Sequence, residues 1–298
     1  MQCRLPPGTI PGCTNTHLAS MTRLSMQNID TPGNLHISPF EDSKLIPAMD
    51  ASRVIKTPYE LKMIRKANAI SALGHTNVLR GIKYISNEAE IEAIFTATCI
   101  AEQAKQQSYG VIAASGENAS ILHYMANNDS LKGRQLVCLD AGCDWQCYAS
   151  DVTRTFPING EYSKEAQEIY DIVEKMQESC IDMIQPGVNF REIHMHAHVV
   201  AALGLIDLGI LHNGSFEEIY KSGVTVAFFL HGLGHFMGLE VHDVGDGGNL
   251  LAGRVDDMLY GMRDKSWLTH FHEMLKDPSA NSASILAANQ VVTVEPGM

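Results

Sequence analysis

Two aspartates close together in the sequence could hold metal ions between them. Asp140 ends the apolar run 136–140, and Asp151 lies in the polar run 150–153. If the chain between them is a hairpin that turns at Trp145-Gln146, the two side chains lie directly opposite each other, with Cβ atoms roughly 5 Å apart. Facing carboxylates repel each other unless they share a proton or a cation, and two-metal hydrolases use such pairs. Surface aspartates at turns would explain the same pattern equally well.

A second group of residues supplies imidazole. The run His231-Gly232-Leu233-Gly234-His235 is followed shortly by Val241-His242-Asp243. Imidazole binds first-row divalent metals well, and the glycines allow the backbone to approach a ligand closely. These glycines also oppose a helix, and no glutamate separates the histidines as in the helical His-Glu-x-x-His zinc motif. A lone histidine is usually structural, but this density of histidine and glycine favours a site.

A third candidate is the carboxylate of Glu295, in Thr293-Val294-Glu295-Pro296-Gly297. It lies at the end of a predicted apolar strand. Alone, it is an ordinary glutamate before a Pro-Gly turn.

Helices and short strands must position these residues. Thr57-Pro58-Tyr59-Glu60 has the N-cap, the proline and the third-position glutamate of a helix start. Further helices are predicted to begin at Asn87, Ser163 and Asn189. Strands are predicted at 111–114, 136–140, 146–156, 224–230 and 291–295. Residues 1 to about 45 are predicted to be irregular, and helix pairs between antiparallel strand pairs indicate an α+β domain.

Composition narrows the class of function. The chain has 298 residues, and 34 acidic against 22 basic residues give a net charge of −12. This balance disfavours nucleic-acid binding and docking on an anionic membrane. The seven cysteines contain no Cys-x-x-Cys pair, which favours reduced structural thiols over a zinc site. Without a signal peptide or an apolar span, the expected location is the cytoplasm.

Together, the motifs resemble the prolidase and Xaa-Pro aminopeptidase family, peptidase family M24B. The resemblance begins at about residue 50 and is carried by residues 117–124, 140–142, 150–157, 231–238, 241–245 and 292–297, in the family's order. It implies an α+β pita-bread domain that binds two divalent ions, usually Mn²⁺, through two aspartates, one histidine and two glutamates. The implied substrate is an Xaa-Pro dipeptide or a short peptide, and the family allows for a homodimer.

The resemblance also implies a role for each matching residue. Asp140 would be a terminal metal ligand and Asp151 a bridging one, while His235 and Glu295 would hold the second ion. A metal-bridged hydroxide would attack the carbonyl before proline, with Glu295 moving the proton. The remaining family histidines, which hold the substrate and stabilise the oxyanion, match His123, His231 and His242.

The chain departs from the family pattern at both ends. We expect residues 1–50 to be an irregular remnant of the family's amino-terminal domain, and residues 51–298 to form the catalytic domain without its last strands. The family's second glutamate, a bridging ligand, would lie beyond Met298, so at least one ion should bind weakly. Arg263 does not clearly match the family's substrate-binding arginine.

Other functions remain open. A pita-bread pseudoenzyme acting as a binding module would fit the missing glutamate. Methionine aminopeptidase and creatinase-like hydrolases share the fold, but the His231–His235 run and the Asp pair fit prolidases better. His194 and His198 share one face of a predicted helix, so a second metal site on the surface is a minor alternative.

Overall fold

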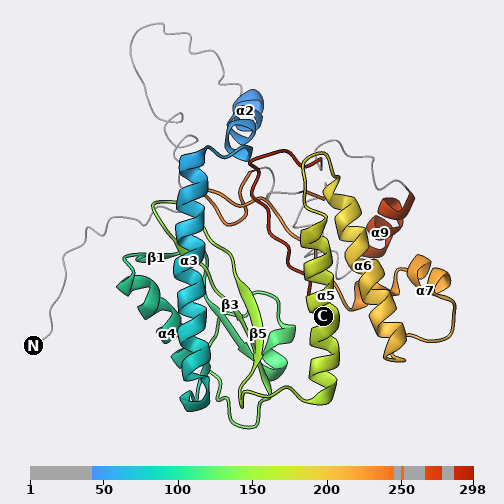
Figure 1. The fold of residues 1–298 in the computed structure, drawn as a ribbon, viewed down its shortest axis with the longest axis horizontal. Coiled ribbons are helices and arrows are strands. Elements are labelled where there is room, and N and C mark those ends of the chain that lie inside the picture. Colours follow the sequence, from blue (N-terminus) through green and yellow to red (C-terminus); the bar gives the residue numbers. More distant parts are fainter. Residues whose placement is uncertain (1–41, 245–249, 252–265, 277–284) are drawn as a thin grey trace, which may run out of the picture. The chain divides into compact units, whose positions relative to one another are not determined.

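The computed structural model describes residues 42–244, 250–251, 266–276 and 285–298. The helices are α2 (Asp42–Val54), α3 (Pro58–Gly81), α4 (Glu88–Ala101), α5 (Lys164–Asp182), α6 (Phe190–Asp207), α7 (Phe216–Ser222) and α9 (Ser266–Lys276). The strands are β1 (Gln106–Gln107), β2 (Ile112–Ser115), β3 (Leu136–Asp140), β4 (Cys143–Asp144) and β5 (Thr153–Pro157). In Figure 1, the long helices α3 and α5 flank the central strands.

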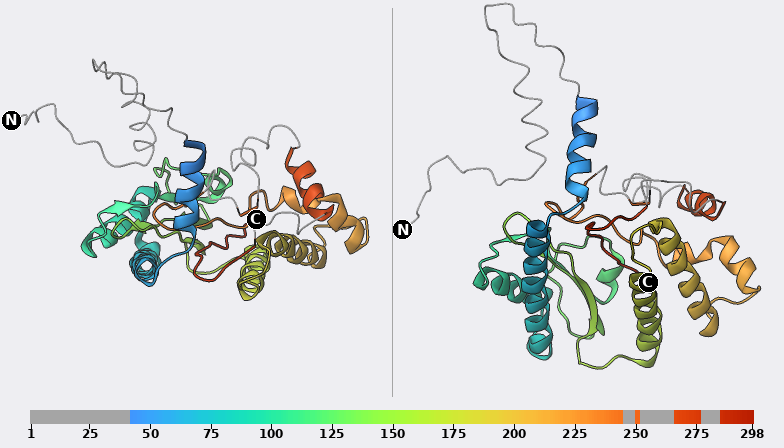
Figure 2. Two further views of the ribbon diagram at one scale, coloured as in Figure 1. Left: turned by 90° about the horizontal axis from the view of Figure 1, so that it is seen from above. Right: turned by 45° about the horizontal axis from the view of Figure 1, so that its top comes forward.

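The central sheet is antiparallel, with strand order β2-β3-β5, and β1 pairs separately with β4. Asp140 therefore ends the middle strand of the sheet. The view from above in Figure 2 shows α3, α5 and α6 on the same side of the strands. None of the helices within the described ranges is both long and apolar enough to cross a membrane.

Local capping explains where the helices begin. Thr57 and Glu60 form the predicted capping box at the start of α3, and the side chains of Asn87, Ser163 and Asn189 cap α4, α5 and α6. Each cap satisfies backbone N–H groups that the first helical turn leaves without a partner. The four predicted helix starts are confirmed.

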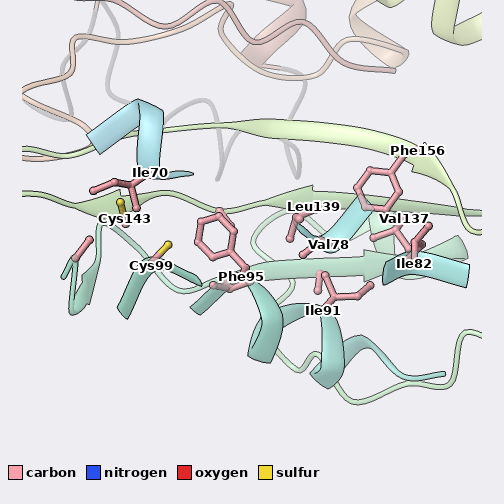
Figure 3. Close-up of a cluster of buried hydrophobic side chains, with 14 of the residues drawn as sticks. Ile70, Val78, Ile82, Ile91, Phe95, Cys99, Val137, Leu139, Cys143 and Phe156 are labelled. Atoms are coloured by element: carbon pink, nitrogen blue, oxygen red, sulfur yellow. The ribbon is translucent and has the colours of Figure 1, made fainter. Parts of the chain in front are cut away.

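The two largest hydrophobic clusters are built from successive parts of the chain. The first lies between α3, α4 and the central sheet, where Phe95 and Ile91 of α4 pack against Leu139 of β3 (Figure 3). The second is built on α5 and α6, with Phe229 and Leu233 from the segment that follows them. The buried members of the first cluster all lie before residue 160 and those of the second all lie after residue 168, although Val54 of α2 also packs against the second. Each half of the chain thus supplies the buried residues of its own core.

Several predictions about local structure were wrong. Residues 291–295 were expected to form a strand but have only an isolated bridge between Val292 and Phe236, and of the strand expected at 146–156 only the part from Thr153 forms, as β5. Residues 224–230 were expected to form a strand, but the structure has a 3₁₀ helix, η3 (Val224–Ala227), after a left-handed Gly223. A short apolar run has the same appearance in a buried strand and in a buried helical turn. Residues 42–50 were expected to be irregular but belong to α2. The rest of that segment, 1–41, lies outside the described residues.

Candidate metal centre

The hairpin that carries Asp140 and Asp151 turns one residue later than expected. Its turn residues are Gln146 and Cys147, whose φ angles are 53° and 68°. This turn pairs Asp140 with Thr153, so the prediction that the two aspartates are directly opposite was wrong. A two-residue turn with positive φ at both positions usually contains Asn or Gly, and the absence of both concealed its position.

Tyr109 holds the two aspartates together despite the changed register. Its hydroxyl lies 2.5 Å from Asp140 Oδ1 and 2.8 Å from Asp151 Oδ1. Burial and the two negative charges raise the pKa of Tyr109 well above its usual range, so the phenol stays protonated and donates to one carboxylate at a time. Tyr109 belongs to none of the sequence motifs. Its position just before β2, which is paired with β3, was the available signal.

Replacing Tyr109 with phenylalanine is expected to weaken metal binding or activity by about 10- to 100-fold, because the carboxylates lose the donor that orients them. Chelator competition on the purified protein would measure the metal affinity. Tyr162→Phe is the matched control, since the Tyr162 hydroxyl donates to the Thr155 carbonyl instead. Equal affinity in wild type and Tyr109→Phe would contradict the role of Tyr109.

Two extended segments bring His235 and Glu295 together. Thr293 N donates to His235 O at 2.9 Å, and Glu295 N donates to Leu233 O at 2.7 Å. A Cβ on Gly234 would lie 2.2 Å from Thr293 O, so only glycine fits between the segments. The sequence suggested that the glycines admit a ligand; at Gly234 the close approach is to another segment of the chain.

Asp151, His235 and Glu295 each direct one ligand atom to a common point. His235 Nε2 lies 3.2 Å from Asp151 Oδ2 and 3.0 Å from Glu295 Oε1, and the three atoms lie within 4.8 Å of one another. His235 Nδ1 is 2.9 Å from the Phe236 carbonyl oxygen. A carbonyl only accepts, so Nδ1 carries a proton and Nε2 faces the two carboxylates.

The charges in this group favour a cation. Burial lowers the pKa of His235, but the carboxylates of Asp151 and Glu295 outweigh burial and raise it to about 10. Burial raises the pKa of Glu295, but the interaction with His235 outweighs burial and lowers it. A proton on Nε2 and a metal ion at the same point would therefore compete.

Asp140 lies beside this group and is joined to it through Tyr109. Its burial and the charge of Asp151 raise the pKa of Asp140 to about 7. A cation bound here would therefore neutralise the charge of Asp140 as well as the charges of Asp151 and Glu295. Of the four residues that the resemblance implied as ligands, Asp151, His235 and Glu295 converge on one point, and Asp140 is linked to them through Tyr109.

The three other histidines that the resemblance implied lie at different depths. The His242 ring packs against the His235 ring, with centroids 4.1 Å apart. His231 is half-buried, and a Cβ on Gly297 would lie 3.4 Å from its Nε2, so it lies beside the segment that carries Glu295. His123 is exposed on the loop after η2 (Gly116–Ser120) and has a left-handed φ of 58°.

The loop that carries His123 is fixed by the buried carboxylate of Glu88. Glu88 accepts hydrogen bonds from the side chains of Ser115, Asn118 and Tyr124 and from the backbone N–H groups of Ser115 and Asp129. Burial would raise the pKa of Glu88, but these donors lower it to about 2.

Glu88→Gln is expected to lower the free energy of unfolding at pH 7 by about 1–3 kcal/mol, because hydrogen bonds to a charged group are lost. The pKa of Glu88 is depressed on folding, so its contribution is complete above about 4.5 and is lost as the pH falls toward about 2. Urea unfolding of both proteins between pH 7 and pH 3 would test this. A difference that stays constant over that range would contradict it.

The remaining sequence candidates do not join the centre. His194 and His198 are buried, not exposed, and His198 Nδ1 lies 3.1 Å from Thr225 Oγ1. The surface metal site suggested for them was therefore wrong. Arg263 lies outside the described residues.

Comparisons with known proteins agree with this geometry. Residues 62–298 match the model of metallopeptidase family M24. Proteins named probable Xaa-Pro aminopeptidase are similar: that of Sclerotinia sclerotiorum is 63% identical over 263 residues, and that of Botryotinia fuckeliana 62% over 265, each match covering 88% of this chain and 47% of the relative. Zinc-substituted E. coli aminopeptidase P in complex with product superposes with a TM-score of 0.68 and 33% identity, over 84% of this chain and 50% of that one. The chain thus spans about half the length of the curated relatives it matches.

Proposed function

Since the chain belongs to metallopeptidase family M24, we propose that it is a metal-dependent hydrolase of Xaa-Pro bonds in dipeptides or at peptide N-termini. Its fold is the α+β pita-bread fold that the sequence resemblance predicted. The observation that carries the proposal is the convergence of Asp151, His235 and Glu295 on one point.

The residues present fit a divalent metal ion. Buried His235 Nε2 and Glu295 Oε1 lie 3.0 Å apart, yet neither makes a hydrogen bond within the described part of the chain. Two carboxylates and an imidazole are a donor set for first-row divalent metals, and we propose Mn²⁺. Asp140 would complete the set, with Tyr109 orienting both aspartates. Such an ion lowers the pKa of water and polarises a peptide carbonyl.

In this proposal, side chains of the protein transfer the proton, stabilise the developing negative charge and hold the substrate. Glu295, half-buried beside His235, takes up the proton of the attacking water and passes it to the leaving amine of proline. His242 and His231 donate hydrogen bonds to the carbonyl oxygen as negative charge develops on it. His123, on its exposed loop, holds the part of the substrate nearest to solvent. This assignment rests on the motif match and on the grouping of these side chains.

The whole protein's partners and location are part of the same proposal. The relatives named as Xaa-Pro aminopeptidases support a peptide substrate. A homodimer in the cytoplasm is the assembly and location we propose, on the basis of the family resemblance and of the cysteine usage.

Measurement of metal content together with Ala-Pro and Arg-Pro-Pro hydrolysis, with and without added Mn²⁺, would test the function. Manganese-dependent release of the residue before proline is expected, with Ala-Ala as the control substrate. The two substrates also separate a dipeptidase from an aminopeptidase. Stoichiometric metal without hydrolysis of either substrate would contradict the enzymatic role, and the protein would then be a metal-binding module.

A further inference from the structure

A buried cluster of charges lies beside the metal centre and is not explained by metal binding. The carboxylate of Asp243 is 1% exposed. Lys56 Nζ lies 2.8 Å from Asp243 Oδ2, and Arg53 Nη2 lies 2.5 Å from Asp243 Oδ1. The Lys56 side chain is also only 1% exposed. Each carboxylate oxygen thus has its own cation, so Asp243 is held in one orientation.

This cluster controls the turn that carries His242. Asp243 N donates to Phe236 O at 2.9 Å, and Gly238 N donates to Glu240 O at 3.0 Å, so residues 236–243 form a closed turn. The imidazole of His242, next to Asp243, packs against His235.

The turn is wrapped tightly around the ion pair. A Cβ on Gly238 would lie 2.4 Å from Asp243 Oδ2 and 2.9 Å from Lys56 Cε. Asp243 and Lys56 therefore cannot shift toward Gly238 without moving the backbone of the turn. A change at Lys56 is therefore transmitted to the turn.

Lys56 also contacts the segment that leads to Glu295. Its backbone N–H donates to Asn289 O at 2.9 Å, a few residues before Glu295 along the chain. Arg53 and Lys56 both precede residue 62, where the match to the family model begins. Lys56, between α2 and α3, thus contacts both the turn that carries His242 and the segment that leads to Glu295.

We propose that Lys56 and Arg53 are positioning residues, which act through Asp243 to hold the His242 side chain against His235. This inference rests on the proposed function where it concerns catalysis. Its structural part, the immobilisation of residues 236–243, is independent of that function.

The catalytic part is tested by a double-mutant cycle. Lys56→Met is expected to lower kcat/KM for an Xaa-Pro substrate by about 10-fold or more, because a small misplacement of a catalytic group is costly. In a His242→Ala background the same change should have less than about a twofold effect, since the residue through which it acts is gone. Effects that multiply in the double variant would overturn the proposal.

The structural part is tested by hydrogen exchange on the full chain. Lys56→Met should accelerate exchange of the Asp243 and Gly238 amides. Lys66→Met is the matched control, because Lys66 is 45% exposed and its pair with Glu102 spans 3.8 Å. Unchanged exchange over 236–243 would overturn the proposal even if the wild type hydrolyses no Xaa-Pro bond. If Lys56→Met does not fold, Arg53→Met, at a side chain 22% exposed, provides the same comparison.

Discussion

Asp151→Asn is expected to abolish metal binding and to reduce Xaa-Pro hydrolysis by more than about 100-fold, while the fold persists. Loss of a group that merely supports a metal ligand costs about 10- to 100-fold, and Asp151 is placed to be a ligand itself. It lies 3.2 Å from His235 Nε2 and shares Tyr109 with Asp140. The neutral amide keeps the shape of the side chain but removes the charge that balances a cation.

Metal analysis and activity should be measured on the same preparation, with circular dichroism to verify folding. His235→Ala should have the same effect on metal content, because it removes the imidazole between the two carboxylates. Asp171→Asn is a suitable control, because this aspartate is exposed on α5 and accepts a hydrogen bond from Gln167. Full activity in both site variants would refute the assignment of the metal centre.

Gly234→Ala is expected to have the second-largest effect, although it changes no charged or polar side chain. The new methyl group would lie 2.2 Å from Thr293 O and 2.8 Å from Thr293 Oγ1, so the two extended segments must separate. Overpacking of this kind costs about 1–3 kcal/mol of stability. Because His235 and Glu295 lie on these two segments, their ligand atoms would also move apart, and metal affinity should fall with stability.

Thermal unfolding and metal titration of Gly234→Ala would measure both losses. Gly81→Ala is the matched control. A Cβ at Gly81 meets its nearest atoms at 3.7 Å, an ordinary contact, and alanine favours the helix. Gly81→Ala should therefore be neutral or slightly stabilising. Wild-type metal affinity in Gly234→Ala would mean that the segments tolerate separation.

The parts of the fold that were predictable depend on signals within a few residues. The capping box at Thr57 and Glu60 is complete within four positions, and it identified the start of α3 correctly. The hairpin register was not predictable in the same way. It depends on positive φ at Gln146 and Cys147, residue types that do not usually indicate such a turn.

The candidate site was predictable as a set of residues but not as a geometry. The motifs identified Asp140, Asp151, His235 and Glu295; the last three converge on one point, and Asp140 is joined to Asp151 through Tyr109. Tyr109 lies 31 and 42 positions from the two aspartates and belongs to none of the motifs. It lies between β1 and β2, where Ser108 N donates to Gly142 O at 2.9 Å and so places this segment beside the hairpin that carries both aspartates. Long-range pairing of this kind leaves no periodic pattern in the sequence.

The division of the site between the two halves of the chain has a consequence for biosynthesis. The aspartates are translated with the first hydrophobic cluster, whereas Glu295 follows the second. At roughly 5–20 residues per second, a ribosome reaches Glu295 about 8 to 30 seconds after Asp140. During that interval the nascent chain can bury its first core, while the two aspartates wait first for His235 and then for Glu295. The three ligand atoms of Asp151, His235 and Glu295 can therefore meet only once the chain has been made as far as Glu295.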